Sequence, residues 1–313
     1  MNKLVVSSSP HIHTSKNTVG IMLDVIIALV PSAIAGVILF GIDALIVLGI
    51  CVITSILSEL VFNLVTKKKQ TVGDLSAVVT GLILGLSLPA DAMTWWQCII
   101  GSVFAIVVVK CLFGGLGCNF ANPAATGRIF IFLAFSKEIG KGVLPKGANL
   151  ITSATTLEMV KGGAGTEDLP SLLDMFLGLR GGAIGETCIL ALVIGYVYLV
   201  LRGVIKFETP LIYVGTVFAL SLIGYGSLEM ALYQILSGAV VYAAVFMITD
   251  YVTTPITRTG KMIFAFGCGV ITFLIRFYGS YPEGVSFALL LMNILSPYIE
   301  KWTAKRPLGG KAA

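Results

Sequence analysis

Charged residues are scarce in this sequence. Only 12% of its 313 residues are Asp, Glu, Lys or Arg, against about 25% in an average soluble domain. So little charge cannot cover a water-facing surface, and the apolar share of 57% exceeds what a single core would hide. The composition therefore excludes an ordinary soluble protein and predicts an integral membrane protein.

Histidine is nearly absent, and cysteine is never clustered. The two histidines, His11 and His13, lie in the polar N-terminal segment, so no membrane helix offers an axial histidine to haem. The six cysteines include no Cys-x-x-Cys pair, which argues against a self-contained iron–sulfur cluster or structural zinc. We also expect no signal peptide, because residues 1–19 are polar and the first apolar run is long enough to stay in the membrane.

Positive charge is distributed unevenly over short loops. The formal net charge is +5, but Lys and Arg fall between apolar runs, so no nucleic-acid surface is predicted. With the N-terminus inside, 15 of the 21 Lys and Arg residues lie on the cytoplasmic side, as the positive-inside rule requires. We therefore expect both termini in the cytoplasm and the long loop at 137–182 outside.

The apolar runs predict an all-α polytopic membrane protein. Backbone in lipid must satisfy its own hydrogen bonds, so each run is expected to be a transmembrane helix. About ten runs occur, near residues 20–40, 44–65, 75–89, 95–113, 123–136, 183–201, 209–224, 230–249, 262–277 and 284–299. The third is short and stops at Pro89, and the fifth carries Pro123 and Arg128, so these two are poor spans on their own.

The two halves of the chain resemble each other. Pro89 precedes Lys110 by 21 residues, and Pro255 precedes Arg276 by the same 21. A repeat of five spans must be inverted relative to its twin, and inverted repeats with interrupted segments place a binding site near the midplane. The matching interrupted segments are Gly81–Pro89 with Met247–Pro255, and Asn122–Phe135 with Tyr281–Pro297.

The domain plan follows from the spans and the repeat. We expect two inverted five-helix repeats joined by an extracytoplasmic loop, with a cytoplasmic tail at each end. The parts are the tail 1–19, the first repeat 20–136, the loop 137–182, the second repeat 183–299 and the tail 300–313.

Several charged residues fall within or beside the predicted helices. A charge at the centre of a membrane helix costs about 2.5–3.5 kcal/mol, so each needs a partner, a cavity or a function. They are Asp24, Glu59, Lys110, Arg128, Asp250, Arg276 and Glu283.

These charges allow more than one interpretation. Asp250 precedes Thr253, Thr254 and Pro255, a cluster of oxygen ligands that suits a cation or the edge of a flavin ring, unless the helix simply ends in interfacial water there. Glu59 is deep enough to favour a paired or cavity-facing role. Asp24 also fits a helix-start carboxylate. Lys110 and Arg276 also fit side chains that snorkel to opposite membrane surfaces.

The long loop contains a helix-start signal. Thr155 with Glu158 three residues later forms a capping box, and the glycine pair at 162–163 would end the short helix. Spacing alone favours this structural role for Thr155.

Five ordered motifs resemble a known family. They are Ser8-Ser9-Pro10-His11 followed by Ile21-Met22-Leu23-Asp24-Val25; Lys110-Cys-Leu-Phe-Gly-Gly-Leu-Gly-Cys-Asn-Phe-Ala-Asn-Pro-Ala-Ala; Phe176-Leu-Gly followed by Gly182-Ala-Ile-Gly-Glu-Thr; Thr249-Asp-Tyr-Val-Thr-Thr-Pro; and Arg276-Phe-Tyr-Gly-Ser-Tyr-Pro-Glu-Gly-Val-Ser-Phe-Ala. Together, over about residues 6–300, they resemble the D subunit of the Rnf complex and its relative, the B subunit of the sodium-pumping NADH:quinone oxidoreductase. The longer N-terminal extension of the quinone-reductase protein is absent, which favours the Rnf type.

The resemblance implies a redox function. It implies a membrane subunit of a ferredoxin:NAD+ oxidoreductase that moves electrons across the bacterial cytoplasmic membrane, coupled to Na+ or H+ export. The implied partners are the A, B, C, E and G subunits of the complex, above all the flavin-bearing G subunit, together with a flavin transferase and the lipid bilayer.

The resemblance also implies a covalent cofactor. In this family FMN is joined through its phosphate to a threonine of an extracytoplasmic loop, and the acceptor here is Thr155. The motif around it comprises Asn149, Thr152, Ser153, Ala154 and Thr156. Asn149 stands where Asp is usual and Ser153 where Gly is frequent, but neither removes the acceptor hydroxyl.

A second site is implied at the repeat interface. There the resemblance suggests a non-covalent riboflavin or the ion-coupling group, with Asp250 as the coupling carboxylate. The candidate residues are Asp250, Thr253, Thr254, Lys110, Asn119, Asn122, Arg276 and Glu283.

Two other functions compete with the redox subunit. Inverted repeats with interrupted helices also suit a channel or secondary transporter, and a membrane anchor without a cofactor is a third reading. The threonine motif of the outer loop favours the redox subunit, because a channel has no need of it.

Overall fold

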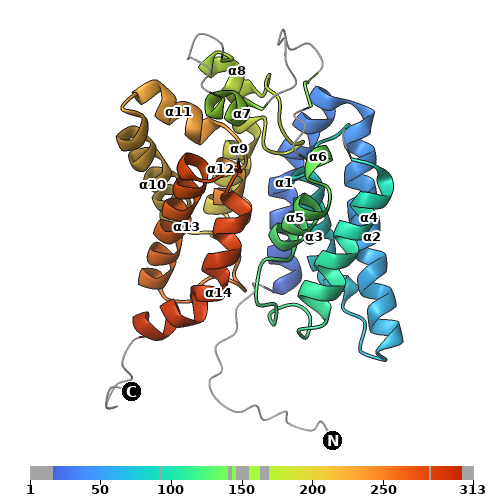
Figure 1. The fold of residues 1–313 in the computed structure, drawn as a ribbon. Helices are drawn as coiled ribbons and strands as arrows, with labels where there is room; N and C mark the ends of the chain where they lie inside the picture. Colours follow the sequence, from blue (N-terminus) through green and yellow to red (C-terminus); the bar gives the residue numbers. More distant parts are fainter. Residues whose placement is uncertain are drawn as a thin grey trace, which may run out of the picture.

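The structure is a computed structural model that describes residues 17–91, 93–139, 143–145, 155–162, 169–281 and 283–304. Within these residues the fold is helical, and the only β pairing is an isolated bridge between Val143 and Gly182. The chain forms two groups of helices side by side, the first half on the right of Figure 1 and the second half on the left. This agrees with the predicted all-α fold class.

The first half contains the longest apolar helices. Its elements are α1 (Thr18–Phe40), α2 (Ile42–Val65), the 3-10 turn η1 (Val72–Asp74), α3 (Ser76–Leu86), α4 (Trp95–Val103), the π-helix η2 (Phe104–Cys111) and α5 (Pro123–Ala134). Helix α5 begins where Asn122 caps it, accepting from the N–H of Ala125 at 3.1 Å, and proline occupies the first helical position. Three short helices follow: α6 (Ser136–Ile139), α7 (Thr156–Lys161) and α8 (Leu172–Leu177).

The second half contains one strongly bent pair of helices. Its elements are α9 (Ile189–Leu201), α10 (Glu208–Tyr225), α11 (Leu228–Leu236), α12 (Val240–Phe246), α13 (Arg258–Tyr278) and α14 (Val285–Thr303). Helices α11 and α12 meet at 53°, with Gly238 between them at a positive φ of 60°. The guanidinium of Arg276 donates to the freed carbonyls of Gln234 and Ser237 at this break, which stabilises the bend.

The predicted number of ten full crossings is not established. Among the described residues, four helices are long and apolar enough to span a membrane alone, namely α1, α2, α10 and α13, and the bent pair α11–α12 adds a fifth if it is one span. Each of the ten predicted runs does contain a helix. The sixth run is helical only from Ile189, because residues 178–188 form a loop whose backbone pairs with the end of α3: Gly185 N–H donates to Leu86 O at 2.7 Å.

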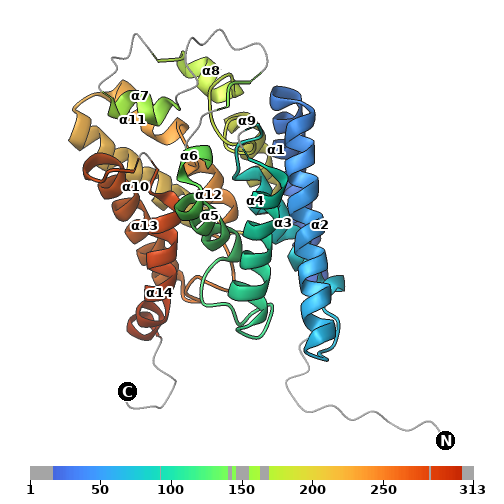
Figure 2. The same ribbon diagram turned by 45° about the vertical axis from the view of Figure 1, so that its right-hand side comes forward.

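Helices that the predicted repeat pairs with each other share part of their packing in the two halves. Helix α2 packs on α3 and α4, and α10 packs on α11, α12 and α13. Between the halves, α1 packs on α9 and α5 packs on α14 (Figure 2). The contact of α2 with α3 is close because Gly81 has no side chain: a Cβ there would lie 2.8 Å from Val52 Cα. The boundaries of the two repeats remain a prediction.

The molecule has two distinct ends. Helices α7, α8 and α11 lie together at one end, and α2 and α14 both end at the other (Figures 1 and 2). The exposed Lys161 closes α7 at the first end, whereas the exposed Lys67, Lys68 and Lys69 follow α2 at the second. The three lysines that follow α2 thus lie at the opposite end of the molecule from α7, and we call this the lysine-rich end.

This separation predicts opposite accessibility for two engineered cysteines. We expect Lys68→Cys and Lys161→Cys, each made with the exposed Cys118 replaced by serine, to react from opposite sides of a sealed membrane. A membrane-impermeant maleimide added to intact cells and to inverted vesicles measures this. Labelling of both positions from one side would contradict the arrangement.

Candidate functional site

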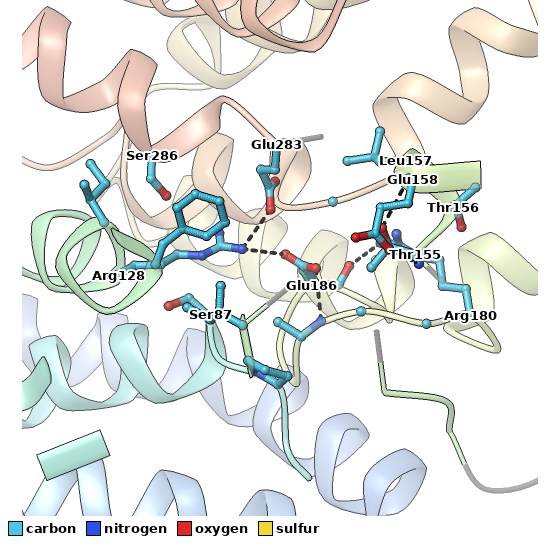
Figure 3. Close-up of a pocket in the computed structure, with 18 of the residues that line it drawn as sticks. Ser87, Arg128, Thr155, Thr156, Leu157, Glu158, Arg180, Glu186, Glu283 and Ser286 are labelled. Carbon is cyan, nitrogen blue, oxygen red and sulfur yellow. Dashed lines mark hydrogen bonds and ion pairs between the residues drawn. The ribbon is translucent and has the colours of Figure 1, made fainter. Parts of the chain in front are cut away.

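An open cavity, which we call the outer cavity, lies at the end that carries α7 (Figure 3). Its volume, with the space open to solvent included, is about 800 Å³. Helices α5 and α14, the end of α3, the 180–186 loop and α7 all contribute to its wall. Its polar and aromatic lining comprises Ser87, Arg128, Phe132, Thr155, Thr156, Glu158, Arg180, Glu186, Glu283, Ser286 and Phe287.

Thr155 stands at the wall of this cavity as the cap of α7. Its Oγ1 accepts from the N–H of Glu158 at 3.3 Å, and its own N–H donates to Glu158 Oε2 at 2.9 Å. The predicted capping box is therefore confirmed. The next hydroxyl, of Thr156, is buried and donates to Met175 Sδ at 3.5 Å. The rest of the predicted motif, Asn149, Thr152, Ser153 and Ala154, lies outside the described residues.

Arg180 lines the same cavity as Thr155 (Figure 3). It is only 1% exposed, and it donates to Glu186 O at 2.6 Å and to Thr187 O at 3.4 Å. Burial lowers the pKa of Arg180 to about 10, so the guanidinium stays positive at neutral pH. A fixed cation thus lines the cavity that Thr155 also lines.

Arg128 occupies the far side of the same cavity. Its Nη2 donates to Glu283 Oε2 at 2.8 Å and lies 3.6 Å from Glu186 Oε2. Both carboxylates are held by backbone: Glu186 Oε1 accepts from Ala183 N–H at 3.0 Å, and Glu283 Oε1 accepts from Ala239 N–H at 2.6 Å. The cavity that Thr155 lines therefore contains two arginines, together with apolar and aromatic side chains.

A second cavity, which we call the inner cavity, lies nearer the lysine-rich end, and its volume is about 780 Å³ with the space open to solvent included. Its polar lining includes Lys110, Asn119, Asn122 and Asp250 from the predicted second site, together with Ser76, Thr80 and Thr249. Each cavity is thus lined by residues of both halves of the chain.

Asp250 is engaged by several donors. Its carboxylate accepts from Thr253 Oγ1 at 3.0 Å, from Val252 N–H at 3.2 Å and from Asn122 Nδ2 at 3.3 Å, while its carbonyl accepts from Thr254 Oγ1 at 2.5 Å. It is partly buried, and both its ion-coupling role and the alternative of a helix end in interfacial water stay predictions. Among the described residues no group of three or more His, Cys, Asp or Glu side chains could hold a metal ion.

Lys110 does not snorkel to the surface. Its Nζ lies 2.9 Å from Glu59 Oε2, both side chains are at most 2% exposed, and Ser76 Oγ also accepts from it at 2.5 Å. Thr71 donates to the other oxygen of Glu59 at 2.6 Å. The π-helix η2 carries Lys110 at this point, and π-turns are frequent where a side chain must be placed for function. The paired role predicted for Glu59 is confirmed.

Three other predicted positions need correction. Arg276 is 4% exposed and caps α11, so it does not snorkel either. Glu283 lies at the outer cavity with Arg128, so it and Arg276 are separate from the Asp250 group. The residues expected at a single site are thus divided between two cavities, because α5 begins at one cavity and α14 begins at the other.

Asp24 lies past the first turn of α1 and pairs with Tyr198 and Arg202 at 2.9 and 3.1 Å, which rules out a simple helix-start carboxylate.

Two charged residues of the outer cavity were missed as candidates for a site. Glu186 and Arg180 lie in the glycine-rich segment between α8 and α9. A signal was present: two charges among the four glycines of residues 178–186, in a sequence otherwise poor in charge, indicate a tightly folded loop rather than a solvated one.

The buried pair of Lys110 and Glu59 predicts a large and asymmetric mutational effect. Lys110→Met should destabilise the protein by about 3–5 kcal/mol, because it leaves the carboxylate of Glu59 buried without its cation. The double variant Glu59→Gln/Lys110→Met should recover most of the loss. Apparent melting temperature in detergent measures this, with the exposed Lys67→Met as control. Equal melting of Lys110→Met and Lys67→Met would contradict the ion pair.

Comparison with known proteins identifies the family. The sequence profile of the NQR2, RnfD, RnfE family matches residues 5–309. The chain is 46% identical to the D subunit of the Na(+)-translocating ferredoxin:NAD(+) oxidoreductase complex of Acetobacterium woodii, over 98% of this chain and 95% of that protein.

Two further relatives agree with this match. Identity is 37% to the D subunit of the proton-translocating ferredoxin:NAD(+) oxidoreductase complex of Clostridium ljungdahlii, over 96% of this chain and 95% of the relative. It is 34% to the D subunit of the ion-translocating oxidoreductase complex of Halorhodospira halophila, over 99% and 96%. The resemblance seen in the motifs is confirmed, and the chain belongs to the NQR2, RnfD, RnfE family.

Proposed function

We propose that this multi-pass membrane protein is the D-type subunit of an ion-translocating ferredoxin:NAD+ oxidoreductase complex and carries FMN covalently on Thr155. Family membership supports the general function, because relatives matched almost end to end are subunits of such complexes. The position of Thr155 at a cavity that contains two arginines supports the cofactor. The subunit is not an enzyme alone: the complex as a whole exchanges electrons between ferredoxin and NAD+ and exports Na+ or H+.

The residues of the outer cavity fit FMN. Thr155 lines the cavity. When a phosphate ester replaces the hydroxyl proton of Thr155, the oxygen still has lone pairs that can accept from the N–H of Glu158. Arg180 would neutralise the phosphate, since its guanidinium is positive and fixed by two backbone carbonyls. Phe132 and Phe287 offer aromatic faces to a planar ring. FMN, when bound, supplies one- and two-electron redox chemistry, while the protein sets its position and field.

The inner cavity is the proposed second site. The non-covalent riboflavin implied by the resemblance would be held there, beside Asn119, Asn122 and Lys110. Asp250 is the carboxylate that we assign to ion coupling, because it lies at the interrupted end of the α12 segment, where Thr253 orients it.

The proposed setting is the bacterial cytoplasmic membrane. We place both termini in the cytoplasm and α7 outside, where a flavin transferase would reach Thr155 and where the flavin-bearing G subunit would dock. The A, B, C and E subunits complete the proposed complex. The second candidate function, a channel or secondary transporter, has no need of the threonine motif that ends at Thr155.

Thr155→Val tests the cofactor assignment. A phosphoester needs the hydroxyl oxygen and valine has none, so covalent FMN should disappear, while the lost cap costs about 1 kcal/mol and the chain still inserts. Ultraviolet fluorescence of the denatured band and intact mass, after co-expression with a flavin transferase, measure this.

Thr156→Val is the matched control for the same experiment. Its hydroxyl is buried against Met175, so this variant should keep the flavin. A wild-type chain without the FMN mass, or a Thr155→Val chain that still carries it, would refute the assignment.

Asp250→Asn tests ion coupling. The change keeps shape and removes charge, so covalent flavin should remain while ions transported per electron fall several-fold in the purified complex. Sodium uptake and lumen pH in proteoliposomes measure this, with Asp24→Asn as a carboxylate control on the cytoplasmic side. Equal transport by wild type and Asp250→Asn would show that Asp250 is only structural.

A further inference from the structure

Three polar atoms of the outer cavity are buried without a hydrogen-bond partner among the described residues. They are Nη1 of Arg128, Oε2 of Glu186 and Oγ of Ser286, and the first two belong to charged groups. The side chains of Arg128 and Glu186 are 13% and 6% exposed and lie next to each other, with Nη2 of Arg128 3.6 Å from Oε2 of Glu186. A buried donor or acceptor left unpaired is costly, and native proteins seldom tolerate it unless a ligand or water completes it.

The unpaired atoms of Arg128 and Glu186 place a hydrogen-bond donor beside an acceptor. Arginine offers only N–H donors, and an ionised carboxylate offers only acceptors. A ligand edge that places a carbonyl or ring nitrogen acceptor next to an N–H donor would therefore satisfy both groups at once. The pyrimidine edge of a flavin has this pattern, with acceptors at N1, the C2 carbonyl and the C4 carbonyl and a donor at N3. The dimethylbenzene edge has neither.

The position of the pair suits a ring tethered at Thr155. Thr155, Arg180, Arg128 and Glu186 all line this cavity, and Figure 3 shows Arg128 on the other side of it from Thr155. In the proposed arrangement Arg180 would neutralise the phosphate, and Arg128 would be free to bind the ring. Phe132 and Phe287 line the same cavity, where they would contact the apolar faces of the ring.

We propose that Arg128 and Glu186 bind the pyrimidine edge of the FMN ring, Arg128 donating to N1 or the C2 carbonyl and Glu186 accepting from N3–H. The inference rests on the proposed attachment at Thr155. Glu283 fixes the guanidinium for this role through its 2.8 Å bond and is itself held by Ala239 N–H.

The pairing has an electrostatic consequence. Two-electron reduction with uptake of one proton leaves negative charge at N1 and the C2 carbonyl. The guanidinium of Arg128 would stabilise that charge, so Arg128 favours the reduced ring and acts as a positioning and tuning group.

The test uses the full chain, co-expressed with a flavin transferase and purified in detergent. Wild type, Arg128→Met, Arg128→Lys and Glu186→Gln are compared first for covalent FMN by in-gel fluorescence. Their visible spectra and midpoint potentials are then measured by spectroelectrochemistry. Lys161→Met is the control, because it removes a cation from the same end but outside the cavity.

We expect all variants to retain covalent FMN. In Arg128→Met the equilibrium constant for reduction should fall at least about tenfold, as expected for a lost hydrogen bond to a charge, which is about 30 mV for a two-electron couple. The equilibrium constant should fall less in Arg128→Lys, which keeps the positive charge. Glu186→Gln should shift the flavin absorption bands, and Lys161→Met should have the potential and spectrum of wild type.

The outcomes separate this inference from the proposed function. Wild type without covalent FMN overturns both. Flavin present in Arg128→Met with the spectrum and potential of Lys161→Met overturns the role of Arg128 alone. If Arg128→Met does not fold, Arg128→Lys and Glu186→Gln test the proposal instead. Potentials and spectra equal to those of wild type in both variants would overturn it.

Discussion

Arg128 joins the two halves of the molecule at the end that carries α7. It extends from α5 in the first half to Glu283, which precedes α14, and to Glu186, which precedes α9. In a low-dielectric interior none of these charges is stable alone. The guanidinium therefore fixes how α5, α14 and the 178–188 loop meet, and the outer cavity exists in the space that this arrangement leaves beside α7.

The same constraint acts at the matched cations of the two halves. Lys110 and Arg276 are equivalent by sequence spacing, and both are buried, but they are neutralised differently. Lys110 pairs with Glu59, whereas Arg276 uses the carbonyls exposed by the break between α11 and α12, with Glu283 at 3.6 Å. A buried carboxylate stabilises the cation in the first half, and the carbonyls of a bent helix stabilise the cation in the second.

The two cavities contain different polar residues because α5 and α14 run in opposite directions. Helix α5 starts at Asn122, beside Asp250, and runs toward the outer cavity; α14 starts next to Glu283 at the outer cavity and runs the other way. Interrupted segments in corresponding positions were predicted to form one site near the midplane. Their polar ends point to opposite sides instead, which gives a carboxylate with threonines in one cavity and arginines with carboxylates in the other.

Composition and pattern determined the membrane class, the helical fold and the family, because apolar runs, helix caps and ordered motifs are local properties of the chain. The capping box of Thr155 and the pairing need of Glu59 could be predicted for the same reason. Only tertiary structure decided that Lys110 is the partner of Glu59, that Arg276 serves a helix break, and that Glu186 faces Arg128. These contacts join residues far apart in sequence, and whether a buried charge meets a carboxylate, a carbonyl or a cavity depends on which helices pack together.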